Sequence, residues 1–262
     1  MTIDIQNRLL ADEISKWVSF DGKQILEVGC GNGDLLKYIA KYYSPELIVG
    51  IDPGLDSWWN AGESSGRNWK VMSGDAELLD FPDNSFDAII SVSTLEHIYD
   101  TDKALSEIKR VLKPYGRFYT SFSPIWTSII GHHFVAPEDN NWNEEHLALI
   151  PPWGHLYMSE IEMRAHLKSL NVNESLKGQI LEFIYHSNII NRKSKTELVN
   201  AVHRCGMAVR LYSEQVRFSR FSITKKNELT PEMANKIIAA GHTLSDVGVS
   251  GLKICLEKLA AC

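Results

Sequence analysis

The sequence predicts an α/β fold in which helices cover both faces of a mostly parallel sheet. Between residues 24 and 122, short segments that are apolar nearly throughout alternate with segments of helical periodicity. Continuous apolar strands are typical of parallel sheets, because the crossover helices bury both faces. With 262 residues, of which 44% are hydrophobic, the chain is long enough to bury such a core without disulfides or metals.

The first part of the chain supplies the elements of this sheet. We expect a helix over residues 4–19, because its apolar residues fall on one helical face: Ile5, Leu9, Leu10, Ile14 and Trp17. Helical spacing resumes at Leu35, and an amphipathic helix is expected over 102–113, with Thr101 as its N-cap and Pro114 and Gly116 ending it. Five short apolar runs are interpreted as strands: 24–28, 47–51, 69–72, 87–92 and 117–122.

The alternation breaks after residue 122. Residues 123–195 are rich in Trp, His, Pro and Asn, and they show helical spacing near 159–170 and 175–190 but no strand pattern. We therefore expect residues 123–195 to form a lid or substrate insertion within a single domain of residues 1–262, whose core is 24–122.

Residues 196–262 return to the regular pattern. We expect a helix capped by Thr196 and ending at Gly206, a sixth strand over 207–212, a helix over 231–241 and a last strand over 252–257.

Glycines follow the first expected strand closely, at Gly29, Gly31 and Gly33. Glycine lets the chain turn sharply out of a strand, and the helix that follows offers free N–H groups to a ligand. A dinucleotide fingerprint would require a further glycine at the position of Asp34. Because a carboxylate there would repel a pyrophosphate, we do not expect NAD or FAD.

Acidic residues follow the next two strands. Asp52 ends the second strand, where a carboxylate can accept hydrogen bonds from both hydroxyls of a ribose. Asp75 follows the third strand, where it can accept a hydrogen bond from an adenine amino group. Each acid alone is compatible with a loop cap, but the three features in this order favour a nucleoside site at the carboxyl edge of the sheet.

Residues 24–122 resemble the class I S-adenosylmethionine-dependent methyltransferases, specifically the small-molecule group (methyltransferase type 11-like). The resemblance rests on four segments in matching order and spacing: ILEVGCGNG, VGIDP, GDAELLDFPDNSFDAIISVSTLEHI and LSEIKRVLKPYGRF. It implies a Rossmann-like sheet of seven strands in the order 3-2-1-4-5-7-6, with strand seven antiparallel.

The resemblance also implies the cofactor, S-adenosyl-L-methionine, and the residues that hold it. By position, Glu27 would reach the amino group, the glycines and the Ser91 backbone would line the methionine part, and Asp52 would hold the ribose. The residues implied to bind the cofactor are Glu27, Gly29, Gly31, Gly33, Asp52, Pro53, Asp75, Ala76 and Ser91.

Two observations argue against a nucleic-acid acceptor. The (D/N)PP(Y/F/W) tetrad of enzymes that methylate nucleic-acid amino groups is absent after the fourth strand, where residues 91–97 read SVSTLEH. Residues 150–153 (IPPW) lie after strand five without a polar first residue, and we interpret them as a turn. The net charge of −6 offers no basic footprint for a polyanion.

The insertion is rich in histidine. His132 and His133 are the first candidates for a general base, His97 is next, and His155 and Tyr157 follow. Trp142 and His146 belong to the same segment. The alternative is that these histidines hydrogen-bond to hold an irregular loop together. We expect no metal, because adjacent histidines usually point apart and no HxH or HxxxH spacing is present.

The function expected is transfer of a methyl group to a small molecule, with O-methylation of a sugar, a glycan precursor or another bacterial metabolite preferred. N-methylation of a small amine and a non-catalytic cofactor-binding partner protein are the alternatives. Scattered cysteines, 4 in all, and the absence of a signal-peptide pattern or an apolar membrane span predict a cytoplasmic protein. The sequence does not indicate an oligomeric state.

Overall fold

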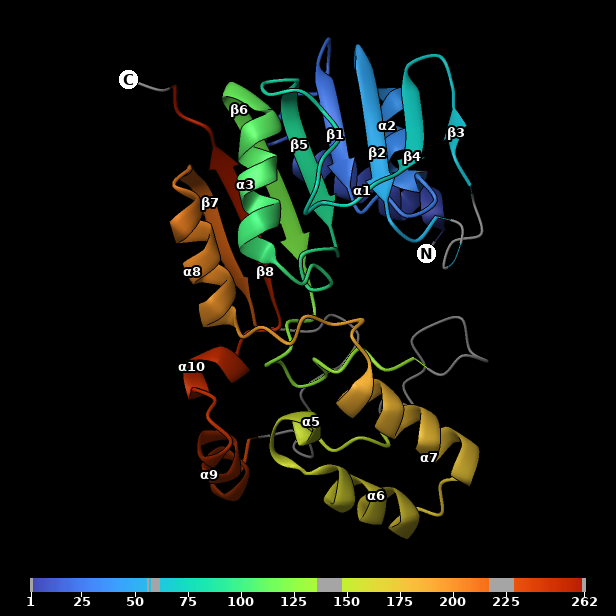
Figure 1. Cartoon of the computed structure of the whole chain (residues 1–262), viewed down its shortest axis with the longest axis vertical. Coiled ribbons are helices and arrows are strands. Elements are labelled where there is room, and N and C mark those ends of the chain that lie inside the picture. The colour runs from blue at the N-terminus through green and yellow to red at the C-terminus, as the bar shows by residue number, and fades with distance from the viewer. Residues whose placement is uncertain (1, 56, 58–61, 136–147, 217–228, 261–262) are drawn as a thin grey trace. The chain divides into compact units, whose positions relative to one another are not determined.

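The computed structural model describes residues 2–55, 57, 62–135, 148–216 and 229–260 (Figure 1). The chain divides into two compact units. The sheet unit contains Met1–Phe122, Val199–Ser213 and Leu252–Cys262, and the helical unit contains Ser123–Leu198 and Glu214–Gly251.

The sheet confirms the predicted fold class. Its order is β3-β4-β2-β1-β5-β6-β8-β7, and β8 runs antiparallel to β6. Apart from β3, this is the 3-2-1-4-5-7-6 order implied by the resemblance. Among the described residues the sheet has eight strands rather than seven. The strands are β1 (Gln24–Val28), β2 (Leu47–Asp52), β3 (Ser64–Ser65), β4 (Trp69–Ser73), β5 (Phe86–Val92), β6 (Leu112–Phe122), β7 (Ala208–Gln215) and β8 (Gly251–Glu257).

Helices cover both faces of the sheet. Figure 1 shows α1 (Ile3–Ile14) and α2 (Asp34–Tyr42) behind the sheet, and α3 (Thr101–Val111) and α8 (Lys195–Cys205) in front of it. The face under α1 and α2 packs into one apolar core, which includes Ile14, Leu36, Ile48 and Ile90. None of the helices in the described ranges combines the length and apolar character needed to cross a membrane.

The first helix is shorter than predicted, and only part of its predicted apolar stripe packs on the core. It ends at Ile14, and it buries Ala11 and Ile14, while Ile5 and Leu9 stay 48% and 55% exposed. The apolar spacing therefore predicted the helix correctly, but it predicted burial for more residues than the core actually buries.

Two predicted N-caps are wrong by one or two residues. In α3 the cap is Asp100, whose carboxylate accepts from the Lys103 N–H, and Thr101 is the first helical residue. In α8 the Ser194 hydroxyl accepts from the Glu197 N–H at 3.2 Å, while Thr196 instead donates to the carboxylate of Asp246. Both caps still use a short polar side chain at the helix start.

The helical unit draws on two segments of the chain. Its helices are α5 (Gly154–Tyr157), α6 (Glu160–Ser169), α7 (Glu174–Leu181), the π-helix η1 (Glu182–His186), α9 (Pro231–Ala239) and α10 (Leu244–Val247). They enclose a second apolar core that includes Trp153, Met163, Ile180 and Ile237. The predicted insertion of 123–195 thus packs with the connection between β7 and β8, and its role as a lid stays a prediction.

Candidate active site

The glycine loop after β1 has a backbone that only glycine adopts easily. The φ angles of Gly29, Gly31 and Gly33 are +74°, +53° and +83°. A Cβ on Gly29 would collide with the Thr94 side chain, and one on Gly33 would collide with Val71. The loop is therefore packed closely against Val71 of β4 and against Thr94, which follows β5.

Asp52 fixes this loop from the end of β2. Its Oδ2 accepts from the Gly31 N–H at 2.9 Å, and its Oδ1 accepts from the Gly54 N–H at 2.8 Å. The side chain is only 7% exposed. Each carboxylate oxygen has a second lone pair, so the same group can also accept from hydroxyls of a bound ribose.

Glu27 is a buried acid at the base of the loop. It is 3% exposed, and its Oε2 has no hydrogen-bond partner among the described residues. Burial raises the pKa of Glu27 to about 8, and the nearby charges of Asp34 and Asp52 add to this. A buried carboxylate with one oxygen lacking a partner among the described residues fits a cationic amino group, whose charge would favour the ionised acid.

The other expected cofactor residues lie at the same edge of the sheet. Ser91, at the end of β5, pairs with Val28, and its buried hydroxyl has no partner among the described residues. Asp75 follows β4 and is exposed, with Oδ1 accepting from the Glu77 N–H at 2.8 Å, while Ala76 is buried. Pro53 follows Asp52 on the surface. The topology thus gathers all of these positions at the carboxyl ends of four adjacent strands.

Sequence reasoning missed Thr94. Its hydroxyl donates to the Val92 carbonyl at 3.0 Å, and the side chain packs directly against Gly29. The available signal was the position of Thr94 in the segment SVSTLEH, directly after the fourth strand. From this segment we inferred only that the (D/N)PP(Y/F/W) tetrad is absent. Thr94 links the loop after β5 to the glycine loop.

The three candidates for the general base are divided between the two units: His97 lies in one, and His132 and His133 lie in the other. His97 lies in the sheet unit, in the loop after β5, and is exposed. His133 lies in the helical unit with a φ of +55°. Its Nδ1 is 3.0 Å from the Gly131 carbonyl, to which it can only donate, so Nε2 is the basic nitrogen of the neutral ring.

His132 is less suited to accept a proton. It is 1% exposed, and its Nδ1 accepts from the Phe134 N–H at 3.0 Å, which leaves the ring proton on Nε2. Burial, together with the nearby His155 and His133, lowers the pKa of His132 well below its ordinary value. Both features favour a permanently neutral ring.

His155 packs against His132 in the same core. Its Nε2 donates to the Trp126 carbonyl at 2.7 Å, and its ring lies edge-on to those of Trp126 and His132, at centroid distances of 4.7 and 5.2 Å. Burial lowers the pKa of His155 to about 4. These contacts agree with the alternative in which a histidine stabilises the fold. Trp142 and His146 lie outside the described residues.

Tyr157 and Trp153 lie near one another in the chain but have different environments. Tyr157 is half-buried, and burial raises its pKa. Trp153 has a φ of +56°, and its indole N–H donates to the Val247 carbonyl at 3.2 Å. This backbone fits the turn that we expected at residues 150–153.

Comparisons with known proteins identify the family. A family model described as a methyltransferase domain matches residues 26–120. The ubiquinone/menaquinone biosynthesis C-methyltransferase of Vibrio cholerae is 30% identical over 200 residues, which cover 68% of this chain and 74% of that protein. The chain belongs to the class I S-adenosylmethionine-dependent methyltransferases.

Other relatives differ in the acceptor that their names give. The fatty-acid O-methyltransferase of Mycolicibacterium smegmatis is 38% identical to this methyltransferase over 109 residues, which cover 40% of this chain and 39% of that protein. A solved S-adenosylmethionine-dependent methyltransferase from Mesorhizobium loti shares the fold, with a TM-score of 0.57, 16% identity and coverage of 98% and 100% of the two chains.

The cofactor of this methyltransferase is S-adenosylmethionine. A solved phosphoethanolamine N-methyltransferase 2 from Haemonchus contortus, in complex with that cofactor, shares the fold, with a TM-score of 0.52, 15% identity and coverage of 97% of this chain and 52% of that chain. The residues at the carboxyl edge fit the cofactor chemically: Asp52 keeps acceptor capacity for ribose hydroxyls beside the glycine loop, and Glu27 has a buried oxygen without a partner among the described residues.

Proposed function

We propose that this methyltransferase transfers a methyl group to a hydroxyl oxygen of a small bacterial metabolite, such as a sugar or a glycan precursor. The observation that carries the proposal is the hydrogen bond from His133 to the Gly131 carbonyl at 3.0 Å. It selects, for the neutral ring, the tautomer whose Nε2 can take a proton. An oxygen nucleophile of high pKa needs such a base, whereas an unprotonated amine does not.

The cofactor supplies an electrophilic methyl group on a sulfonium, and methyl transfer is an in-line displacement. Positioning therefore provides much of the rate. We propose that Asp52 and the glycine loop orient the nucleoside and methionine parts, and that the ionised Glu27 holds the amino group. In the same proposal, Nε2 of His133 takes the acceptor's proton.

Methylation at carbon is the second candidate. It is supported by the Vibrio cholerae relative, which is named a C-methyltransferase and of which 74% is covered by the alignment with this chain. Carbon acceptors that are electron-rich also benefit from a base that removes a proton. The chemical stability of the product distinguishes the possibilities: methyl esters are cleaved by mild alkali, whereas methyl ethers and C-methyl groups are not.

The test is a screen of the purified chain with S-adenosylmethionine carrying a deuterated methyl group. Sugars, fatty acids, phenols, quinols and small amines would serve as acceptors, and S-adenosylhomocysteine release would be measured. We expect turnover with an oxygen acceptor, and mass spectrometry after alkali treatment would locate the label. Turnover with amines alone would contradict O-methylation. Cofactor binding without turnover across the panel would favour a non-catalytic partner protein.

A further inference from the structure

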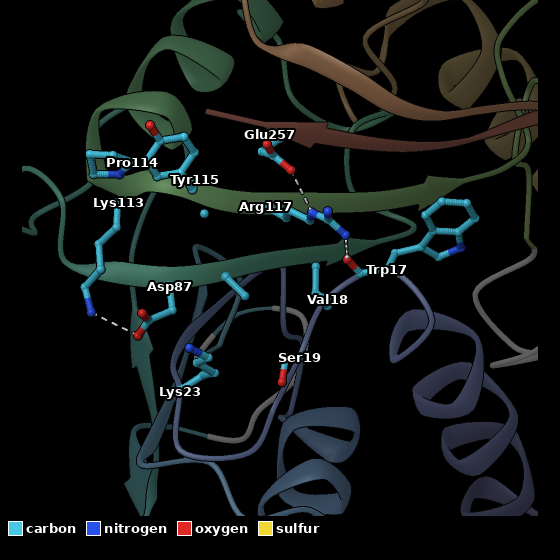
Figure 2. Close-up of a pocket in the computed structure, with 12 residues that line it drawn as sticks. Trp17, Val18, Ser19, Lys23, Asp87, Lys113, Pro114, Tyr115, Arg117 and Glu257 are labelled. Carbon is cyan, nitrogen blue, oxygen red and sulfur yellow. Dashed lines mark hydrogen bonds and ion pairs between the residues drawn. The ribbon is translucent and has the colours of Figure 1, made fainter. Parts of the chain in front are cut away.

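A cavity of about 510 Å³ opens at the amino-terminal ends of β5 and β6, the edge of the sheet opposite Gly29 and Asp52 (Figure 2). Its walls come from the segment after α1, the starts of β5 and β6 and the end of β8, all within the sheet unit. This volume lies within the usual range of small-molecule sites. The proposed methyl transfer makes no use of it.

An irregularity in the sheet creates this cavity. Phe86 pairs with Leu112 and Ala88 pairs with Arg117, so the whole segment 113–116 lies opposite Asp87. Its backbone is fixed, because the Tyr115 N–H donates to the Lys258 carbonyl at 2.7 Å. A Cβ on Gly116 would come within 2.8 Å of the Lys113 carbonyl oxygen and 2.9 Å of that of Asp87. The wall of the cavity is therefore a built feature and not a loose loop.

Cations outnumber carboxylates around the cavity. Glu257 is shared by Arg117 and Arg210, at 3.0 and 2.7 Å. Asp87 pairs with Lys113 at 2.9 Å and also accepts from the Gln24 N–H at 3.0 Å.

Lys23 also lines the cavity, and it forms no ion pair within the described part of the chain. Among the lining residues, Lys23, Lys113 and Arg117 thus carry positive charge and only Asp87 and Glu257 carry negative charge, which leaves a positive excess in a protein whose net charge is −6.

Aromatic residues stand at the two ends of this cationic surface. Figure 2 shows Trp17 at one end and Tyr115 beside Lys113 at the other, with Lys23 and Arg117 between them. The Arg117 guanidinium is held in place by a hydrogen bond from Nη1 to the Trp17 carbonyl at 3.0 Å. Planar rings stack favourably on such side chains and on guanidinium groups.

We propose that this cavity binds a small organic anion in which a phosphate or carboxylate group is joined to a planar ring. The anionic group lies against Lys23 and Lys113, and the ring lies against Tyr115. Because the cavity and the glycine loop are at opposite ends of the strands, this ligand binds together with the cofactor and does not compete with it.

Isothermal titration of the full chain tests the proposal, with S-adenosylhomocysteine present at saturation so that adenosine cannot enter the cofactor site. The probes are adenosine 5′-monophosphate, benzoate, inorganic phosphate and adenosine. We expect saturable binding of the nucleotide or of benzoate, with phosphate and adenosine binding more weakly. Binding of adenosine 5′-monophosphate would identify phosphate as the preferred anionic group, and binding of benzoate would identify carboxylate.

Lys23→Gln is the decisive variant, because Lys23 has no ion pair to lose within the described residues, and Lys168→Gln on the exposed end of α6 is its matched control. We expect Lys23→Gln to weaken binding about tenfold, with S-adenosylmethionine affinity unchanged. Absence of binding by both ring-bearing anions would overturn the proposal. So would equal affinity for inorganic phosphate, or an unchanged affinity in Lys23→Gln.

Discussion

Asp52 accepts a hydrogen bond from the Gly31 N–H at 2.9 Å, which joins the end of β2 to the glycine loop after β1. Its other oxygen accepts from the Gly54 N–H at 2.8 Å. One buried carboxylate thus shapes the loop and keeps acceptor capacity for a ligand.

We predict that Asp52→Asn weakens S-adenosylmethionine binding by roughly 10- to 100-fold, since a hydrogen bond to a charged group contributes about 1.5–3 kcal/mol. The amide offers one acceptor where the carboxylate offers two, so one backbone N–H loses its partner. Titration calorimetry measures the loss. The exposed Glu182→Gln on η1 is the control, and equal affinity in both variants would contradict the role of Asp52.

Gly29→Ala tests the loop backbone directly. We expect loss of cofactor binding and a lower thermal midpoint, because φ is +74° and the new Cβ collides with Thr94. Gly178→Ala in α7 is the control, since nothing lies within 4 Å of a Cβ there, and it should stabilise the protein by about 0.5–1 kcal/mol. If the two variants behave alike, the steric argument is wrong.

The raised pKa of Glu27 predicts that cofactor binding releases a proton. With a pKa of about 8 in the free protein, Glu27 is mostly protonated at pH 7, and a bound ammonium group would ionise it. We expect cofactor binding at pH 7 to release close to one proton, measured by calorimetry in buffers of different ionisation enthalpy. Glu27→Gln should abolish the release. A binding reaction without proton exchange in the wild type would argue against contact with Glu27.

The same pKa predicts how Glu27 affects stability. The folded-state pKa is raised above the ordinary 4.5, so the folded protein binds more protons than the unfolded chain between about pH 4.5 and 8. The contribution of Glu27 to stability therefore decreases as the pH rises through this range. Without cofactor, Glu27→Gln should be more stable than the wild type at pH 8, as measured by denaturant unfolding; a less stable variant would contradict this.

His155 gives the opposite pH dependence. Its pKa is lowered from 6.5 to about 4, so the unfolded chain binds more protons between these values. The stability contribution is complete above pH 6.5 and is lost as the pH falls toward 4, by about 3 kcal/mol. His155→Gln should flatten the curve of unfolding free energy against pH, as measured by denaturant unfolding at several pH values, and an unchanged slope would contradict this.

The base candidates separate by kinetics. We predict that His133→Ala lowers kcat by about 10²- to 10⁴-fold while S-adenosylmethionine affinity is kept. His132→Ala should instead lower stability, because that ring is buried and its Nδ1 accepts from Phe134. Full activity in His133→Ala, with loss in His97→Ala, would assign the role to His97.

Much of the sheet could be predicted because its strands are short runs that are apolar on both faces. β1 begins and ends at the predicted residues, and the other predicted strands fall within the observed ones or miss them by one residue at an end. Strand β3 could not be predicted, since Ser64 and Ser65 carry no apolar pattern and their pairing with Val71 and Lys70 is a tertiary contact.

The site was predictable where chemistry follows strand ends, as at Gly31 and Asp52. It was not predictable where a role depends on packing. The tautomers of His132 and His155 are set by the backbone of Phe134 and Trp126, and no spacing in the sequence reveals those contacts. The joining of 123–198 with 214–251 in one core likewise depends on long-range packing.

The central claim is that the glycine loop and Asp52 form the S-adenosylmethionine site, and amide NMR spectra recorded during a titration with this cofactor test it most directly. We predict saturable shifts concentrated at the amides of Gly29, Gly31 and Gly54, which are lost in Asp52→Asn. Binding that leaves these amides unmoved, or no binding at all, would contradict the claim.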